Sequence, residues 1–362
     1  MHIGIPAEIK DHEFRVGATP ADVAEYVADG HRVTVGHGAG KAIGFSDADY
    51  MAAGARLGKA ADVYAADLVL KVKEPQAAEY PLLRPGQLLF CYLHLAAAPE
   101  LAQELIQRQV SAIAFETISD RAGHTPLLAP MSEIAGRLAT QYAAHYLTLP
   151  QQGRGVLLAG AAGVEPARLL VIGGGMAGSN AAQIALGMGA DVTLLDRNPA
   201  RLRELQQRFG PALKTGFSHD DTLRRLLPNT DAVIGAAYVP GRHAPRLLTA
   251  EHMRLLPAGA VLVDISIDQG GISETSHPTT HSEPVYLAHG VVHYCVANMP
   301  AAVARTSTLA LTQAVRPYVQ MLARNGLSAL DGHPGLAAGL NIHAGEITYP
   351  GLEEDLAGTK KT

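Results

Sequence analysis

Short apolar runs alternate with amphipathic segments along the first 125 or so residues. Helical spacing of apolar positions predicts helices over 19–31, 46–58 and 98–109, with Thr19 and Ser46 as candidate N-caps. The apolar runs predict buried strands at 2–9, 32–38, 67–75, 87–95 and 111–116. Strands that alternate with helices are typical of a mostly parallel sheet with helices on its faces.

A second alternating series follows, bracketed by two long helical patterns. In the first pattern, over 125–147, Ile134, Leu138, Tyr142 and Tyr146 recur every four residues and define one helix face. The second pattern spans 306–326 and stops at Asn325-Gly326. Between them, apolar runs predict strands at 168–173, 191–196, 231–237, 260–266 and 291–298. The arrangement predicts an α/β domain inserted into the first one, with long helices as connections.

Composition narrows the class of protein. The chain has 362 residues, 48% of them hydrophobic, and a formal net charge of −5. It is too long for one core, which predicts two domains, and it is too apolar to be disordered. No run of Lys and Arg marks a nucleic-acid or membrane surface, and neither a signal peptide nor an apolar span is expected. Cys91 and Cys295 are far apart in apolar contexts, which favours two reduced thiols in a cytoplasmic protein over a disulfide.

The stretch RLLVIGGGMAGSNAAQIALGMGADVTLLD, from Arg168 to Asp196, has the pattern strand, glycine turn, helix, strand. Gly173, Gly175 and Gly178 have G-x-G-x-x-G spacing, in which one glycine makes the turn, one admits a pyrophosphate and one allows close helix packing. The helix start then faces the phosphates with unbonded N–H groups. The alternative is a glycine-rich turn without a ligand. The flanking elements favour a dinucleotide site. Together with the two alternating series of strands and helices, they favour two Rossmann-like domains.

Asp196 ends the second strand, about 20 residues after the glycines, where a carboxylate accepts hydrogen bonds from ribose hydroxyls. The same charge repels the 2′-phosphate of NADP. Arg197 directly follows and offsets part of that repulsion. The sequence therefore favours NAD as the cofactor.

Four further candidates lie at predicted strand ends, where open parallel sheets place their sites. Arg15 and Lys73 are cations that suit a carboxylate, His94 is a titratable imidazole, and Asp268 precedes a glycine pair. Taken singly, each has another interpretation: a surface ion pair, a solvated strand end, a core histidine and a turn residue. Together they form the set that hydride chemistry on an amino or keto acid requires.

The chain resembles the bacterial L-alanine dehydrogenases over nearly its whole length. The resemblance rests on GIPAEIKDHEFRVGATP, LKVKEP, LHLA, LLAPMSEIAGRLA, VIGGGMAGSNAA, VLVDISIDQGG and YCVANMPAAVARTST. It implies NAD-dependent, reversible oxidative deamination of L-alanine to pyruvate and ammonia, in the cytoplasm and usually by a homohexamer. It also implies a discontinuous substrate domain, 1–127 with 306–362, and an NAD-binding Rossmann domain, 128–305.

The resemblance assigns roles to residues. Arg15 and Lys73 become ligands of the substrate carboxylate or carbonyl, and His94 and Asp268 become proton carriers. The residues it implies around the cofactor, with the glycine loop, are Ser132, Gly173, Gly175, Met176, Ala177, Gly178, Asp196, Arg201, Ser218, Ala237, Tyr238, Ile265, Ser266, Ile267, Val296, Asn298 and Met299.

The chain departs from the family pattern at three places. The fingerprint reads Gly-Gly-Gly where Gly-Ala-Gly is more usual, and His277 stands where some members have an arginine near the cofactor. Some members bind magnesium through a glutamate and a histidine; here Glu116 is in place, but the counterpart of the histidine is Asn325. We therefore expect no metal site.

Two alternatives stay open. One is an NAD(H)-binding module of the transhydrogenase type, which shares this architecture but passes hydride to a partner domain; the presence of Lys73 and His94 favours the dehydrogenase. The other is a dehydrogenase of a different small L-amino acid. The apolar residues Leu127 and Met131 near the predicted site favour a small substrate.

Overall fold

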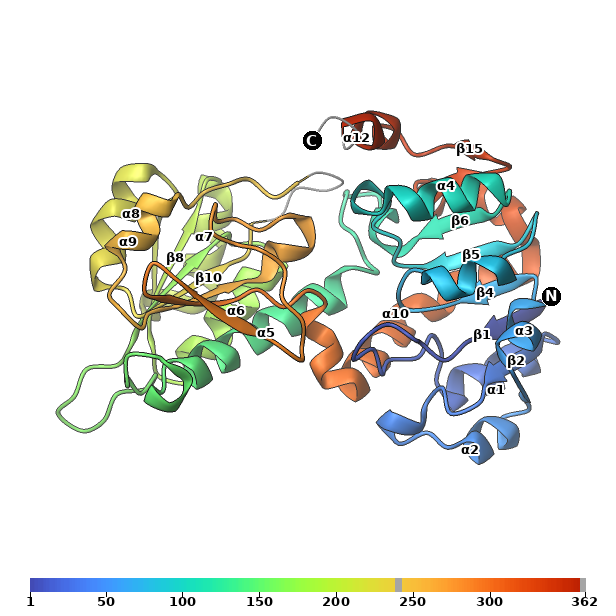
Figure 1. The fold of residues 1–362 in the computed structure, drawn as a ribbon, viewed down its shortest axis with the longest axis horizontal. Helices are drawn as coiled ribbons and strands as arrows, with labels where there is room; N and C mark the ends of the chain where they lie inside the picture. The colour runs from blue at the N-terminus through green and yellow to red at the C-terminus, as the bar shows by residue number, and fades with distance from the viewer. Residues whose placement is uncertain (238–242, 359–362) are drawn as a thin grey trace. The chain divides into compact units, whose positions relative to one another are not determined.

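The computed structural model describes residues 1–237 and 243–358, and the chain divides into two compact units. Unit 1 comprises Met1–Met131 and Ala301–Thr362, and unit 2 comprises Ser132–Pro300. In Figure 1, unit 1 contains the blue to teal part of the chain together with the orange helix α10 and the red C-terminal part, and unit 2 contains the part between them, from green to light orange. Unit 2 is thus an insertion in unit 1. The predicted fold class, two α/β units with one inserted in the other, is confirmed.

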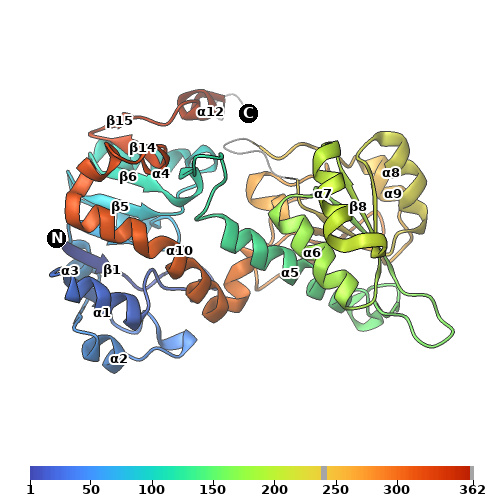
Figure 2. The same ribbon diagram turned by 180° about the vertical axis from the view of Figure 1, so that it is seen from behind.

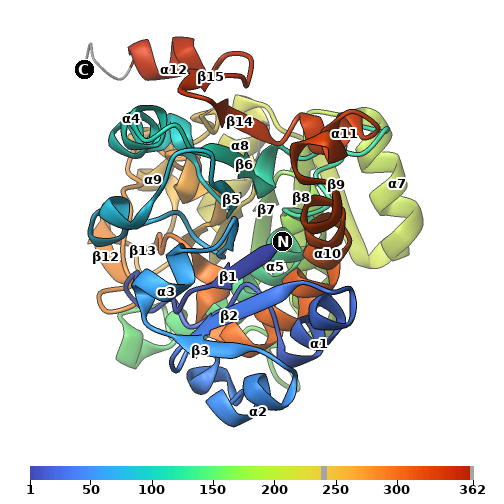
Figure 3. The ribbon, with the colours of Figure 1, turned by 90° about the vertical axis from the view of Figure 1, so that its right-hand side faces the viewer.

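Within the described residues, the sheet of unit 1 has eight strands in the order β15-β14-β6-β5-β4-β1-β2-β3. The six strands from β6 to β3 are parallel and have the 3-2-1-4-5-6 order of a Rossmann sheet, and β14 and β15 add an antiparallel edge. Figure 3 shows strands β1, β2 and β3 side by side. The strands are β1 (His2–Ile5), β2 (Arg32–Gly36), β3 (Arg56–Gly58), β4 (Leu68–Leu70), β5 (Leu88–Cys91), β6 (Ser111–Ala114), β14 (Leu340–His343) and β15 (Glu346–Ile347).

Helices cover both faces of this sheet. Helix α4 lies in front of the strands in Figure 1, and α10 lies in front of them in Figure 2, which views the molecule from behind. Thr19 caps α1 in a capping box with Asp22, as the sequence predicts. The helices of unit 1 are α1 (Pro20–Ala28), α2 (Asp47–Ala52), α3 (Ala60–Tyr64), α4 (Pro99–Gln107), α10 (Ala304–Asn325), α11 (Pro334–Ala337) and α12 (Leu352–Gly358).

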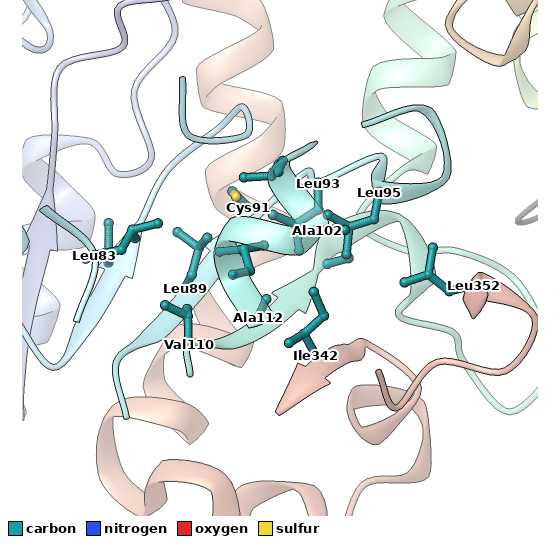
Figure 4. Packing of buried hydrophobic residues seen from close by; sticks show 14 of the residues in the cluster. Leu83, Leu89, Cys91, Leu93, Leu95, Ala102, Val110, Ala112, Ile342 and Leu352 are labelled. Atoms are coloured by element: carbon teal, nitrogen blue, oxygen red, sulfur yellow. The ribbon is translucent and has the colours of Figure 1, made fainter. Parts of the chain in front are cut away.

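The apolar core under α4 joins the two separate segments of unit 1. Figure 4 shows Leu89 and Cys91 of β5 and Ala112 of β6 packed with Ile342 of β14 and Leu352 of α12. Alternate residues of each strand share a face, so the apolar runs of the sequence line this core. The C-terminal segment therefore completes a core that the N-terminal segment begins.

The sheet of unit 2 has seven strands among the described residues, in the order β12-β13-β11-β10-β7-β8-β9. All pair in parallel except β12, which again gives the Rossmann order with one antiparallel edge strand. The strands are β7 (Arg168–Ile172), β8 (Asp191–Asp196), β9 (Leu213–Phe217), β10 (Ala232–Gly235), β11 (Val261–Asp264), β12 (Val285–Ala288) and β13 (Val291–Tyr294). The helices are α6 (Met176–Gly187), α7 (Pro199–Phe209), α8 (Asp220–Leu226) and α9 (Ala250–Leu255).

Helix α5 (Ala129–Tyr146) is the long helix that the four-residue spacing predicts, and it packs closely against α6. A Cβ at Gly136 would lie 2.0 Å from the carbonyl oxygen of Ala177, so only glycine permits this approach. Thr140 Oγ1 donates a hydrogen bond to the Ala181 carbonyl at 2.9 Å, one turn further along. The contact fixes α5 beside the helix that follows the glycine loop.

The structure corrects one predicted helix and adds strands. The helix predicted over 46–58 ends at Ala52, because Gly54 adopts φ +93°, and residues Arg56–Gly58 form β3 beside β2. Strands β9, β12, β14 and β15 were not predicted; they are short or lie at sheet edges, where the apolar pattern is weak. No helix within residues 1–237 and 243–358 is both long and apolar enough to cross a membrane.

Candidate active site

Both sheets reverse strand order at their centre, between β1 and β4 in unit 1 and between β7 and β10 in unit 2. Ligands of open α/β sheets bind beyond the carboxyl ends of the strands at such a point. Arg15, Lys73 and His94 follow β1, β4 and β5, which are neighbours in the first sheet. The glycine loop follows β7, and Asp268 follows β11, in the second sheet. In each unit, the predicted residues therefore lie beyond the carboxyl ends of the parallel strands.

The guanidinium of Arg15 is buried and fixed by Glu13. Arg15 Nε and Nη2 donate to the two carboxylate oxygens of Glu13 at 2.7 and 2.5 Å, and the backbone N–H of Arg15 donates to Oε1 at 3.0 Å. The Nη1 atom lies 3.1 Å from the Met131 sulfur. Burial acts to lower the pKa of Arg15, but the Glu13 carboxylate outweighs it and raises that pKa. Arg15 is thus a permanent, oriented cation.

Lys73 is buried and sits on a backbone held by an internal ion pair. Lys71 Nζ lies 3.0 Å from carboxylate oxygens of both Glu8 and Glu79, and none of these side chains is more than 7% exposed. The second oxygen of Glu8 accepts hydrogen bonds from the N–H groups of Val72 and Lys73, at 2.7 and 3.4 Å. Burial acts to lower the pKa of Lys71, but Glu8 and Glu79 raise it. This pair fixes the segment that carries Lys73.

The carboxylate of Glu74 lies between two lysines. One oxygen accepts a hydrogen bond from Lys10 Nζ at 2.5 Å, and the other lies 3.9 Å from Lys73 Nζ. Burial acts to raise the pKa of Glu74, but Lys73 and Lys10 outweigh it, so the pKa is lowered. Glu74 therefore stays ionised beside Lys73.

His94 follows β5 with its side chain 31% exposed. Its backbone adopts the left-handed conformation, φ 49° and ψ 42°, which is uncommon for a residue other than glycine. The imidazole stacks on the ring of Tyr92, with 5.9 Å between ring centroids and 10° between planes. The Tyr92 hydroxyl donates to the Leu127 carbonyl at 2.5 Å, and burial raises the pKa of Tyr92. A buried, anchored tyrosine thus supports an accessible histidine.

The three glycines of the fingerprint differ in backbone conformation and in the space around them, as their spacing in the sequence predicts. Gly173 has φ +102°, and a Cβ there would lie 2.5 Å from the Ala236 carbonyl oxygen. A Cβ at Gly178 would lie 1.8 Å from the Gly173 oxygen, so the helix could not approach the strand. A Cβ at Gly175 would meet nothing within 4 Å, and α6 begins there without a side-chain cap. The loop therefore has an open, uncapped helix start, a feature that suits an anionic group.

Asp196 fastens this loop to β8. Its Oδ2 accepts a hydrogen bond from the Gly174 N–H at 2.7 Å, and its Oδ1 accepts one from the Asn198 N–H at 2.8 Å. Arg201 Nε donates to the Gly174 carbonyl at 2.6 Å. Each carboxylate oxygen has two acceptor sites, so these backbone bonds leave Asp196 able to accept from a ribose hydroxyl.

Asp264, a buried residue at the end of β11, organises the segment that carries Asp268. Its carboxylate accepts hydrogen bonds from the N–H groups of Ser266 and Ile272, at 3.1 and 2.8 Å, and from the Ser276 hydroxyl at 2.6 Å. Burial raises the pKa of Asp264. Asp268 lies in the short helix Ile265–Gln269 with an exposed side chain.

The other predicted cofactor residues follow the strands of unit 2. The Ser266 hydroxyl donates to the Ala237 carbonyl at 2.7 Å, which joins the ends of β11 and β10. The Ser218 N–H donates to the Asp196 carbonyl at 3.2 Å. Tyr238 lies outside the described residues. The remaining positions lie on α5, on the first turn of α6, in the Ile265–Gln269 helix and after β13: Ser132, Met176, Ala177, Ile265, Ile267, Val296, Asn298 and Met299.

Sequence reasoning missed three acids whose side chains hold these segments: Glu8, Glu13 and Asp264. A charged residue inside a strongly apolar run, such as Lys71, is the signal that could have indicated a buried ion pair. Glu13, two residues before Arg15, gives no such signal, because acids near arginines are common on surfaces.

Known proteins are similar to this chain over nearly its whole length. Residues 4–135 match the family described as alanine dehydrogenase/PNT, N-terminal domain, and residues 139–350 match its C-terminal domain. The alanine dehydrogenase of Halomonas elongata is 53% identical over 98% of this chain and 96% of its own length. Those of Mycobacterium tuberculosis and Bacillus subtilis are 50% and 49% identical over 98% of this chain, covering 97% and 95% of their own lengths.

Solved structures give the same result. A structure named L-alanine dehydrogenase superposes with a TM-score of 0.94, at 45% identity, over 99% of both chains. A transhydrogenase structure from Sinorhizobium meliloti superposes with a TM-score of 0.81, at 26% identity, over 97% of this chain and 99% of the other.

Proposed function

The chain belongs to the alanine dehydrogenase/PNT family, and from that premise we propose that it is an NAD-dependent L-alanine dehydrogenase. The reaction is the reversible oxidative deamination of L-alanine to pyruvate and ammonia. The observation that carries the proposal lies at the carboxyl ends of the strands. Those of unit 1 have two buried cations and an accessible histidine, and those of unit 2 have a glycine loop with the spacing of a dinucleotide site. We further propose that unit 1 is the substrate domain and unit 2 the NAD-binding domain.

NAD fits unit 2 because the loop after β7 is shaped for a phosphate group. Gly175 opens toward empty space, and the uncapped start of α6 presents N–H groups and the positive end of the helix dipole. Asp196 would accept from the ribose hydroxyls, and its charge favours NAD over NADP. When bound, NAD accepts the hydride from the substrate and NADH returns it.

The substrate carboxylate is held by the cations of unit 1. Arg15 presents a planar guanidinium that Glu13 holds in one orientation, and a planar fork suits a carboxylate. Lys73 adds a second positive charge at the adjacent strand end. Holding the substrate at two points fixes the direction of its α C–H bond, which hydride transfer requires.

His94 and Asp268 move the protons. Hydride can leave the α carbon only when the amine is neutral, so a base must first take a proton from the ammonium group. Water addition to the imine and loss of ammonia then need an acid-base group at the same carbon. His94 is accessible at its strand end, and Asp268 is an exposed carboxylate on a segment fixed by Asp264.

The substrate is small. Met131 packs against Arg15 Nη1, and the Leu127 carbonyl accepts the Tyr92 hydroxyl, so both residues are fixed beside the site in unit 1. Initial rates with a panel of L-amino acids, and with the corresponding 2-oxo acids plus ammonia, test this. We expect alanine and pyruvate to be fastest; faster turnover of leucine or glutamate would contradict it.

The reaction itself is tested by NADH absorbance with purified protein, L-alanine and NAD alone. A steady rise in absorbance supports the dehydrogenase. Binding of NADH without any alanine-dependent reduction would instead support a transhydrogenase-type module, which the similarity to the Sinorhizobium meliloti structure makes the second candidate. Replacing NAD with NADP in the same assay tests the cofactor preference.

We also propose that the protein is a cytoplasmic homohexamer. Leu149, Leu157 and Val164, which lie between α5 and β7, are 72%, 68% and 64% exposed. Leu149, Leu157 and Met188 also line an apolar groove of about 430 Å³ in unit 2. Exposed apolar side chains that gather around a groove are typical of a protein–protein interface, which supports association with further copies of the chain. Light scattering of the wild type, and of Leu157→Glu, tests whether the assembly is a hexamer and uses this surface.

A further inference from the structure

Glu116 binds two consecutive backbone N–H groups at the strand end that carries His94. Its Oε1 accepts from the His94 N–H at 2.6 Å and from the Leu93 N–H at 3.2 Å, and its Oε2 lies 3.3 Å from the Leu93 nitrogen. The same Oε1 lies 4.0 Å from His94 Nδ1. Glu116 belongs to the short helix Phe115–Thr117, directly after β6, and β6 pairs with β5. The carboxylate thus joins the ends of two neighbouring strands.

This contact explains how His94 keeps an unfavourable backbone conformation. The left-handed region is unfavourable for a residue with a Cβ, so it persists only where the surroundings impose it. Hydrogen bonds to a charged carboxylate are stronger than those to a neutral acceptor, and they compensate for this cost. Successive N–H groups turned to one side form a concave anion site, and here the protein fills that site with its own carboxylate.

We infer that Glu116 is a positioning residue: by binding the Leu93 and His94 amides it fixes the backbone from which the His94 imidazole reaches the substrate. The inference rests on the proposed role of His94 as a proton carrier. Both carboxylate oxygens face backbone amides, so this function requires no metal ion. Tyr92, stacked on the imidazole, restrains the ring, and Glu116 restrains the main chain below it.

The first test is Glu116→Gln, assayed by steady-state kinetics. Glutamine has the same size but places an NH₂ group where one carboxylate oxygen was, and it carries no charge. We expect kcat for alanine oxidation to fall about 100-fold, because a shift of about 1 Å in a reacting group has that effect. The KM for alanine and the NADH affinity, measured by fluorescence, should stay within about threefold, since Arg15, Lys73 and the glycine loop are untouched.

A double-mutant cycle with His94→Ala separates positioning from general damage. If Glu116 acts through the His94 side chain, Glu116→Gln lowers kcat no further once that side chain is gone. A purely structural role would lower kcat by the product of the two single effects. The matched control is Asp67→Asn, which removes a carboxylate that accepts the His2 N–H at 2.8 Å, away from the site. It should lower the melting temperature and leave kcat unchanged.

Two further measurements test the backbone conformation of His94 and the need for a metal ion. A crystal structure of Glu116→Gln should show His94 outside the left-handed region; a backbone that stays there, with wild-type kcat, would overturn the inference. Dialysis of the wild type against EDTA should leave kcat unchanged, and a loss that magnesium restores would make Glu116 a metal ligand instead. If the wild type does not oxidise alanine, the proposed function is wrong. If the wild type oxidises alanine and Glu116→Gln has the same kcat as the wild type, only the role of Glu116 is wrong.

Discussion

Glu13→Gln is the perturbation whose effect the structure defines best. Glu13 and Arg15 are a fully buried pair, with side chains 0% and 2% exposed. The carboxylate accepts three hydrogen bonds from Arg15, two from the guanidinium and one from its backbone N–H. Glutamine keeps one acceptor oxygen but turns an NH₂ group toward a buried cation that has lost its counter-charge.

The expected loss of stability follows from that burial. Breaking a buried ion pair by removing one partner costs about 3–5 kcal/mol, because the remaining charge stays desolvated. Hydrogen bonds to charged groups contribute about 1.5–3 kcal/mol each, and glutamine retains part of one of them, which gives a similar figure. At about 2–4 °C per kcal/mol, the melting temperature should fall by about 6–20 °C.

The assay is thermal unfolding of four variants beside the wild type. Glu13→Gln and Arg15→Met each remove one charge of the buried ion pair, whereas Glu13→Leu combined with Arg15→Met replaces the pair with apolar groups. The double variant should melt within a few degrees of the wild type. Glu104→Gln, which breaks an exposed pair with Arg108, is the control and should change the melting temperature by less than about 2 °C.

Kinetics add a second readout. The double variant folds but lacks the guanidinium, so the KM for pyruvate should rise about 10- to 150-fold, the equivalent of about 1.5–3 kcal/mol of lost charge-assisted hydrogen bonding. The reasoning is refuted if Glu13→Gln is as stable as the wild type, or if the double variant loses as much stability as the two single variants together.

Three other predictions concern catalysis, cofactor choice and pH. His94→Ala and Asp268→Asn should each lower kcat about 100- to 10,000-fold while NADH binding, followed by fluorescence, survives; near-wild-type turnover of Asp268→Asn would make Asp268 a turn residue only. Asp196→Ala should raise the KM for NAD and narrow its preference over NADP, and equal wild-type rates with both would contradict our account of Asp196. The pKa of Glu74 is lowered in the folded state, so its ionised form stabilises the protein above the ordinary value of about 4.3, and that stabilisation is lost as pH falls through the lowered value. Melting temperatures between about pH 5 and 3 should fall more steeply for the wild type than for Glu74→Gln, and parallel curves would rule this out.

The sequence alone determined the local elements and the nucleotide fingerprint. Apolar periodicity located most central strands and both long helices, because strand and helix periods are properties of neighbouring residues. The spacing of Gly173, Gly175 and Gly178 indicated a tight turn, a phosphate approach and a close packing contact. The structure has a positive φ at Gly173, open space at Gly175 and a close backbone contact at Gly178. The alternation of elements also determined the fold class, since strands joined by helices pair in parallel.

Strand partners far apart in the chain were decided only by the tertiary structure. Strand β14 joins β6 across more than 200 residues, and its Ile342 packs with Ala112 in the core that Figure 4 shows. Residues 46–58 continue a helical pattern past Ala52, yet the positive φ of Gly54 and an available edge on β2 turn Arg56–Gly58 into a strand. Helix propensity is a weak preference, and tertiary contacts such as the pairing of β3 with β2 override it.

The chemistry divides in the same way. The residue types at strand ends indicated Arg15, Lys73 and His94 as candidates, because parallel sheets gather their sites there. The acids that contact them, Glu13 at Arg15 and Glu116 at the His94 backbone, could not be assigned as their partners, because a carboxylate has no fixed partner in a linear pattern. Burial removes water as a competing partner, and only in the folded chain does a specific carboxylate become the one group able to satisfy a specific cation or amide.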